Sequence, residues 1–136
     1  MKKLLLFVSA VALTASLNSC SSSSSGGGSS MSMKVGGTKK TFQTEGVAAG
    51  GGTTYVFGWI GDAEDPTEQI SFTVTGTGAD KITSFVYSSD TNDTYTSSSM
   101  TSNITTNSTS SSKGTFSGTA SNFAGDDVVI TEGTYS

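Results

Sequence analysis

Apolar and polar residues alternate with a period of two along much of this chain after residue 30. In the clearest segment, Ile70, Phe72 and Val74 alternate with serine and threonine. Successive side chains of a β-strand point to opposite faces, so this pattern predicts a half-buried strand over residues 70–75. No segment beyond the first twenty residues has apolar residues at helical spacing over three turns, and we therefore expect no helix there.

The remaining strands are expected from the same pattern. In the segment 82–87 we expect Ile82 and Val86 on one face and Phe85 and Tyr87 on the other. Turn-forming residues separate the segments, and Gly36-Gly37 suits a two-residue hairpin turn. The other strands are predicted over 31–35, 38–44, 55–60, 115–120 and 128–135, with weaker ones around 95 and over 100–104.

Eight or nine short strands with short connections indicate an all-β fold. Thr favours strands because its branched Cβ fits a pleated surface, and Thr and Ser dominate the chain after residue 20. We expect an antiparallel β-sandwich, with a small up-and-down barrel as the alternative. About a hundred residues, 31–136, suffice for one β domain.

Tyr55, Phe57 and Trp59 share one face of the strand predicted over 55–60, opposite Val56 and Ile60. Aromatic side chains supply much of the core of a small domain, and we expect this row to be the core face. The alternative is a flat platform that stacks on sugar rings, in which Tyr55 and Trp59 bind the ligand. Trp59 lies near the strand end between Gly58 and Gly61 and is the residue of the row most suited to contact solvent.

The N-terminus has the order of a secretion signal. Lys2 and Lys3 precede an apolar run from Leu4 to Leu13, which is too short for a membrane-spanning helix of about 20 residues. Residues 1–19 are therefore predicted to be a signal peptide. Residues 20–30 are Cys20 followed only by Ser and Gly, a composition typical of a flexible tether with a span of about 15–20 Å.

The segment Leu17-Asn18-Ser19-Cys20 resembles the lipobox of bacterial lipoproteins, with Leu17 and Ser19 at matching positions and Asn18 less usual at its own. The resemblance implies cleavage before Cys20 and acylation of its thiol, so that lipid on Cys20 anchors the protein to a membrane. Cys20 is the only cysteine, and no intramolecular disulfide can form. The expected location is the cell envelope, with the outer membrane favoured.

Composition excludes several classes of function. The mature chain would hold five lysines and eleven acids, a net charge of −6, and no arginine. Nucleic acids require a basic surface, so we expect no nucleic-acid partner. The chain has no histidine, which removes the commonest general base and metal ligand, and a Ser-His-Asp triad cannot exist. We expect that the protein is not an enzyme and that it binds no cofactor.

Acidic residues cluster in predicted loops, above all Asp62, Glu64 and Asp65. Calcium binds six to eight oxygens, and loop carboxylates could provide some of them. None of the clusters has the spacing of an EF-hand loop, and we expect solvated acids that keep the protein soluble, with calcium binding as the alternative.

The segments 113–120 and 128–135 are similar to the closing hairpin of small bacterial lipoproteins of uncharacterised function. The opening 31–42 is similar to their first hairpin. This resemblance implies a small β domain and provides no catalytic residue. The sequence thus predicts a lipid-anchored envelope protein with a structural or interaction role and an unidentified protein or glycan partner; the alternative is a carbohydrate-binding module.

Overall fold

The computed structural model describes residues 29–136, which form nine strands and no helix. The predicted strands are all present, and the two weaker ones are parts of a single long strand, β7. The strands are β1 (Ser30–Val35), β2 (Thr38–Gly50), β3 (Thr53–Gly61), β4 (Pro66–Val74), β5 (Gly78–Ala79), β6 (Ile82–Ser88), β7 (Thr94–Asn107), β8 (Ser112–Ser121) and β9 (Asp127–Tyr135).

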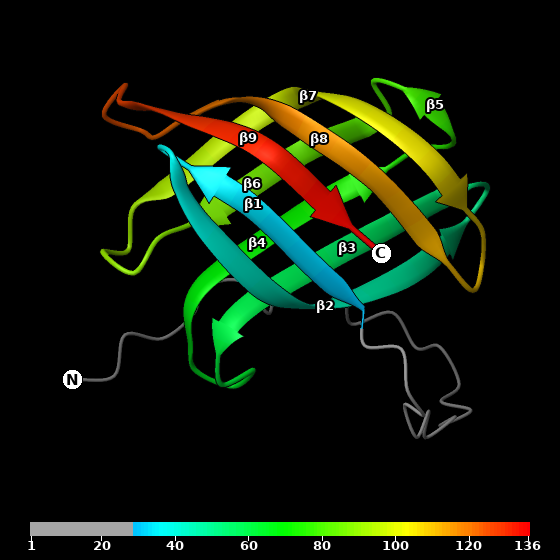
Figure 1. The fold of residues 1–136 in the computed structure, drawn as a ribbon, viewed down its shortest axis with the longest axis horizontal. Helices are drawn as coiled ribbons and strands as arrows, with labels where there is room; N and C mark the ends of the chain where they lie inside the picture. The colour runs from blue at the N-terminus through cyan, green and yellow to red at the C-terminus, as the bar shows by residue number, and fades with distance from the viewer. Residues whose placement is uncertain (1–28) are drawn as a thin grey trace.

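All strand pairings are antiparallel, and the sheet closes on itself. The strands are hydrogen-bonded in the order β7-β6-β4-β3-β2-β1-β9-β8, and β8 pairs in turn with β7. The result is an eight-stranded up-and-down barrel, with the two-residue β5 added beside β7 (Figure 1). The all-β antiparallel class is confirmed, and of the two architectures left open by the sequence the sheet adopts the barrel.

The first hairpin has the predicted glycine turn. Gly36 and Gly37 have φ values of +55° and +86°, the left-handed conformation that a two-residue type I′ turn requires at both positions. Val35 and Thr38 flank the turn as a pair, and the register continues without a shift along β1 and β2.

Bulges in β6 and β9 change which side chains face the interior. Ser84 and Glu132 have φ values of +53° and +50°, and the pairing of each strand with a neighbour shifts by one residue nearby. A bulge increases local twist and bends a strand, which is how a sheet curls into a barrel. Our assignment of Ile82 and Val86 to a common face was wrong: Ile82 lies inside, and Val86 lies on the outer face.

The interior is a packed apolar core. Phe72, predicted to be inward, is 2% exposed, and its ring centroid lies 5.3 Å from that of Phe116 and 5.2 Å from that of Tyr135. Space for these large rings comes from inward glycines. A Cβ on Gly133 would lie 2.6 Å from the Phe116 ring, and one on Gly58 would lie 2.7 Å from Ile70.

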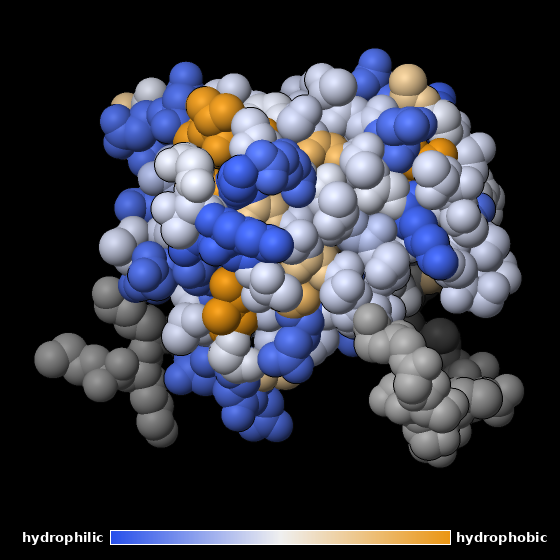
Figure 2. All heavy atoms as spheres, in the orientation of Figure 1, coloured by the Kyte–Doolittle hydropathy of each residue, from blue (hydrophilic) through white to orange (hydrophobic). Residues whose placement is uncertain are grey.

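The outer surface is largely hydrophilic on the side formed by β1, β8 and β9, where hydrophobic residues are isolated (Figure 2). An ion pair joins Lys34 on β1 to Glu132 on β9 across this surface. Strands β3, β4 and β6 form the wall behind β1 and β9 in Figure 1.

Candidate functional site

The aromatic row of β3 lies outside the barrel. Tyr55 and Phe57 are 44% and 46% exposed, and Trp59 is half-buried. The inward positions of the same strand are held by Thr54, Val56 and Gly58. The prediction that this row is the core face was therefore wrong, and so was the expectation that Trp59 is the residue of the row most suited to contact solvent, because it is the least exposed of the three. The interior of a small eight-stranded barrel has room for a limited number of side chains, and rings from other strands already fill it.

A shallow groove of about 560 Å³ runs along the outer surface beside Phe57 and Trp59. The pairing of β3 with β4 places the residues that line the groove side by side: Trp59 pairs with Gln69 of β4, and Phe57 pairs with Ser71. Gln69 and Ser71 pair in turn with residues 88 and 86 of β6, so the groove crosses three strands. Other residues that line the groove are Pro66, Val86, Ser88, Ser89, Asn92 and Thr94.

The chemistry of this outer groove combines aromatic faces with neutral hydrogen-bonding groups. Amides of Gln69 and Asn92 both donate and accept, as do the serine and threonine hydroxyls. Asp65 also borders the groove. A sugar ring has an apolar C–H face and a hydroxylated edge, so an aromatic ring beside amides and hydroxyls can contact both.

A polar network lies inside the barrel at the end that holds the β1–β2 turn. Glu68, 7% exposed, accepts a hydrogen bond from Lys40 Nζ at 2.6 Å and one from the Tyr87 hydroxyl, also at 2.6 Å. Burial raises the pKa of Tyr87 well above its ordinary value of 10.0, and the hydrogen bond to Glu68 raises it further. The Tyr87 ring stacks on Tyr95 at 6.1 Å between centroids.

Our sequence analysis missed this network, although the signal was present. Glu68 stands two residues before Ile70 and shares the inward face of β4. Lys40 stands two residues before the buried Phe42 on β2 in the same way. The network gives the buried Glu68 carboxylate two hydrogen-bond donors, Lys40 and Tyr87, at this end of the interior.

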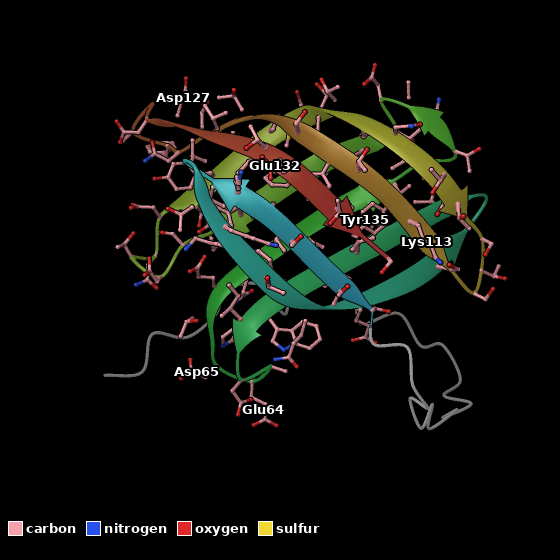
Figure 3. The ribbon with its side chains drawn as sticks, in the orientation of Figure 1. Glu64, Asp65, Lys113, Asp127, Glu132 and Tyr135 are labelled. Atoms are coloured by element: carbon pink, nitrogen blue, oxygen red, sulfur yellow. The ribbon has the colours of Figure 1, made fainter. Side chains whose placement is uncertain are left out.

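The carboxylates proposed for calcium do not form a metal site. Asp62, Glu64 and Asp65 are exposed in the β3–β4 loop, and Asp62 Oδ1 accepts a hydrogen bond from the Glu64 backbone N–H at 2.9 Å. Figure 3 shows Glu64 and Asp65 at the loop tip, pointing away from the barrel and far from Asp127. Within residues 29–136, no group of three or more Asp, Glu, His or Cys side chains could hold a metal ion.

Several predictions concern the N-terminus and stay predictions. The signal peptide and the lipidated Cys20 lie outside the described residues, as does most of the tether. In the part of the chain that the structure describes, no helix could span a membrane.

Comparison of the chain with protein-family models, with functionally described proteins and with solved structures finds no match. The evidence on function therefore comes from the residues themselves. Of the residues proposed from the sequence for ligand binding, Tyr55 and Trp59 lie on the same outer face, and Phe57 joins them between the two.

Proposed function

We propose that this protein is a lipid-anchored, non-enzymatic glycan-binding protein of the cell envelope. Its binding site is the outer groove beside Phe57 and Trp59. The observation that carries the proposal is the outward orientation of three aromatic side chains on one strand, of which Tyr55 and Phe57 are exposed and Trp59 is half-buried, while residues of other strands fill the core.

The geometry of the row suits a linear ligand. Residues two apart on a strand are about 6.5–7 Å apart along its axis, and their side chains stand on the same face. Tyr55, Phe57 and Trp59 therefore form a track along β3 that several sugar units of one chain can contact together. Single exposed apolar residues are ordinary on protein surfaces, whereas a contiguous exposed patch marks a contact surface.

The polar lining favours a neutral or weakly polar saccharide over a charged ligand. Gln69 and Ser71 lie directly across from Trp59 and Phe57, and Asn92 and Thr94 stand at the far side. The net negative charge of the chain, −4 in full, disfavours polyanionic glycans.

The proposed lipid anchor would place this binding surface close to a membrane. Acylation of Cys20 would hold the barrel at a membrane, and a tether of about ten residues would allow a reach of about 15–20 Å. The aromatic track could then engage glycans near that membrane. In this role the protein would hold a polysaccharide chain at the cell envelope, or attach the cell envelope to such a chain.

Trp59 is the only tryptophan, so its fluorescence reports on this groove alone. We expect neutral oligosaccharides to shift the emission of the full-length protein, and a glycan array to identify the preferred linkage. Phe57→Ala should weaken binding by at least about tenfold, equivalent to about 1.4 kcal/mol.

The matched control is Phe123→Ala. Phe123 is fully exposed in the β8–β9 loop, away from the groove, and its loss should leave glycan affinity unchanged. An array without hits, or equal effects of the two substitutions, would overturn the glycan proposal. An interaction role with a protein partner would then be the better interpretation of the exposed row.

A further inference from the structure

Two glutamines flank Trp59 on the outer face of the barrel, one on each side. Gln43 of β2 and Gln69 of β4 both pair directly with Trp59, and both are exposed. Directly paired residues of antiparallel strands have Cβ atoms about 4.5–5.5 Å apart, so either side chain can reach a ligand that lies on the Trp59 ring. The two carboxamides nevertheless differ in their hydrogen bonds.

The Gln43 carboxamide is engaged within the protein, whereas that of Gln69 is not. Gln43 Nε2 donates to the backbone oxygen of Gly61 at 3.3 Å, and Gln43 does not line the outer groove. Gln69 does line the groove, and its side chain makes no hydrogen bond to another of residues 29–136. The groove therefore contains a carboxamide whose donor and acceptor are both available to a ligand.

A polar row continues from Gln69 across the sheet. Gln69 pairs with Ser88 of β6, Ser88 pairs with Thr94 of β7, and the two hydroxyl oxygens are 3.2 Å apart. Neighbouring strands are about 4.8 Å apart, so the carboxamide and the hydroxyls follow one line away from Trp59. A sugar stacked on Trp59 would have its β4 edge against this line of neutral hydrogen-bonding groups.

An apolar side chain lies diagonally beside Gln69. Val86 lines the groove, is half-buried on the outer face of β6, and stands two residues before Ser88, the partner of Gln69. Diagonal neighbours of this kind are about 7–8 Å apart, a span that one ligand substituent can bridge. The groove thus places a small apolar surface next to an available carboxamide.

The charged groups of the groove do not favour an anionic ligand. Its charged lining residues are Asp65 and Glu68, and the Glu68 carboxylate already accepts hydrogen bonds from Lys40 and Tyr87. Among residues 29–136, no lysine lines the groove. Recognition here depends on neutral donors and acceptors.

On the basis of the glycan-binding function proposed above, we propose that Gln69 determines specificity and that the ligand is a glycan of N-acetylated hexosamine units. An acetamido group has one N–H donor and one C=O acceptor in a plane, as the Gln69 carboxamide does, so the two can exchange a pair of hydrogen bonds. With the sugar ring on Trp59, the acetamido methyl group would cover Val86. A hydroxyl in place of the acetamido group would satisfy one side of the Gln69 carboxamide and leave Val86 uncovered.

The test compares the linear trimer of N-acetylglucosamine with the glucose trimer of the same linkage. Binding is followed by Trp59 fluorescence of the full-length protein in detergent micelles. We expect the wild type to bind the N-acetylated trimer at least about tenfold more tightly. Gln69→Leu, which is similar in size but has no hydrogen-bonding group, should bring the two affinities within about threefold.

Gln43→Leu is the matched control, because it is the same substitution on the other side of Trp59. It should keep the tenfold preference of the wild type. Both positions are exposed on the outer face, and circular dichroism with thermal unfolding establishes that both variants are folded.

The outcomes separate the role of Gln69 from glycan binding itself. Binding of both trimers without preference, or a preference that Gln69→Leu retains, would overturn the N-acetylhexosamine proposal and leave glycan binding intact. An equal loss of preference in the two variants would overturn the assignment to Gln69. Absence of binding by either trimer up to millimolar concentration, together with an array without hits, would overturn the glycan-binding function as well.

Discussion

Alkaline pH should unfold this protein through its buried tyrosines. Burial raises the pKa of Tyr87 above 10.0, with the Glu68 hydrogen bond adding to the effect. Burial also raises the pKa of Tyr135, partly offset by the hydrogen bond with Ser112. Below pH 10 both tyrosines are protonated in the folded and unfolded states. Above it the unfolded chain releases protons that the folded protein retains, so stability falls as pH rises.

The size of this loss follows from linkage. A tyrosine that stays protonated in the folded state lowers the free energy of unfolding by about 1.4 kcal/mol between about pH 8 and pH 11. For Tyr87 alone this is a substantial part of a typical stability of 5–15 kcal/mol. Tyr87→Phe removes this contribution, so the variant should lose about 1.4 kcal/mol less than wild type over the same pH range. At neutral pH the same substitution removes a hydrogen bond to a charged group and should cost about 1.5–3 kcal/mol.

The assay is urea unfolding followed by circular dichroism over this pH range, with tyrosinate absorbance recorded in parallel. Other groups that titrate in the range act equally in both proteins, so the difference between wild type and Tyr87→Phe isolates one hydroxyl. Tyrosinate absorbance from Tyr87 should rise only with unfolding. If the two proteins lose stability equally with pH, or if all four tyrosines ionise in the folded protein near pH 10, the burial argument is refuted.

Two further predictions concern the core and the anchor. Phe72→Ala should lower the free energy of unfolding by about 3–5 kcal/mol, because it removes a ring from the centre of the buried aromatic cluster. Phe57→Ala, on the outer face, should lower it by under about 1 kcal/mol in the same urea titration. Similar costs for the two substitutions would contradict the assignment of the two faces. Cys20→Ala should leave the precursor unprocessed or release the barrel from membranes in cell fractionation, and an Ala variant that fractionates and migrates like wild type would refute the lipid anchor.

The network of Lys40, Glu68 and Tyr87 illustrates a signal that was present in the sequence but could not be interpreted alone. Alternation places Glu68 on the inward face with Ile70. A carboxylate at such a position is expensive to bury without partners. Its partners come from β2 and β6, and only the closed sheet brings those strands to the same interior.

Local patterns did determine much of this protein. The alternation of apolar residues with Ser and Thr was enough for the all-β class and for nearly every strand, because a period of two is a property of each strand by itself. The Gly36-Gly37 turn was readable for the same reason, since two consecutive positive φ values require residues that tolerate them. Phe72 was placed correctly because the polar residues of its strand alternate with apolar ones throughout.

Only the tertiary structure decided which face of a strand points inward when both faces carry apolar side chains. In β3 both faces carry apolar side chains, Val56 on one and Tyr55, Phe57 and Trp59 on the other, so the pattern could not determine which faced inward. The answer depended on how much room remained inside a barrel already filled from other strands. Bulges at Ser84 and Glu132 bend β6 and β9 within the closed sheet. Closure and interior volume depend on all eight strands together, which is why the outer groove beside Phe57 and Trp59 emerged only in the folded chain.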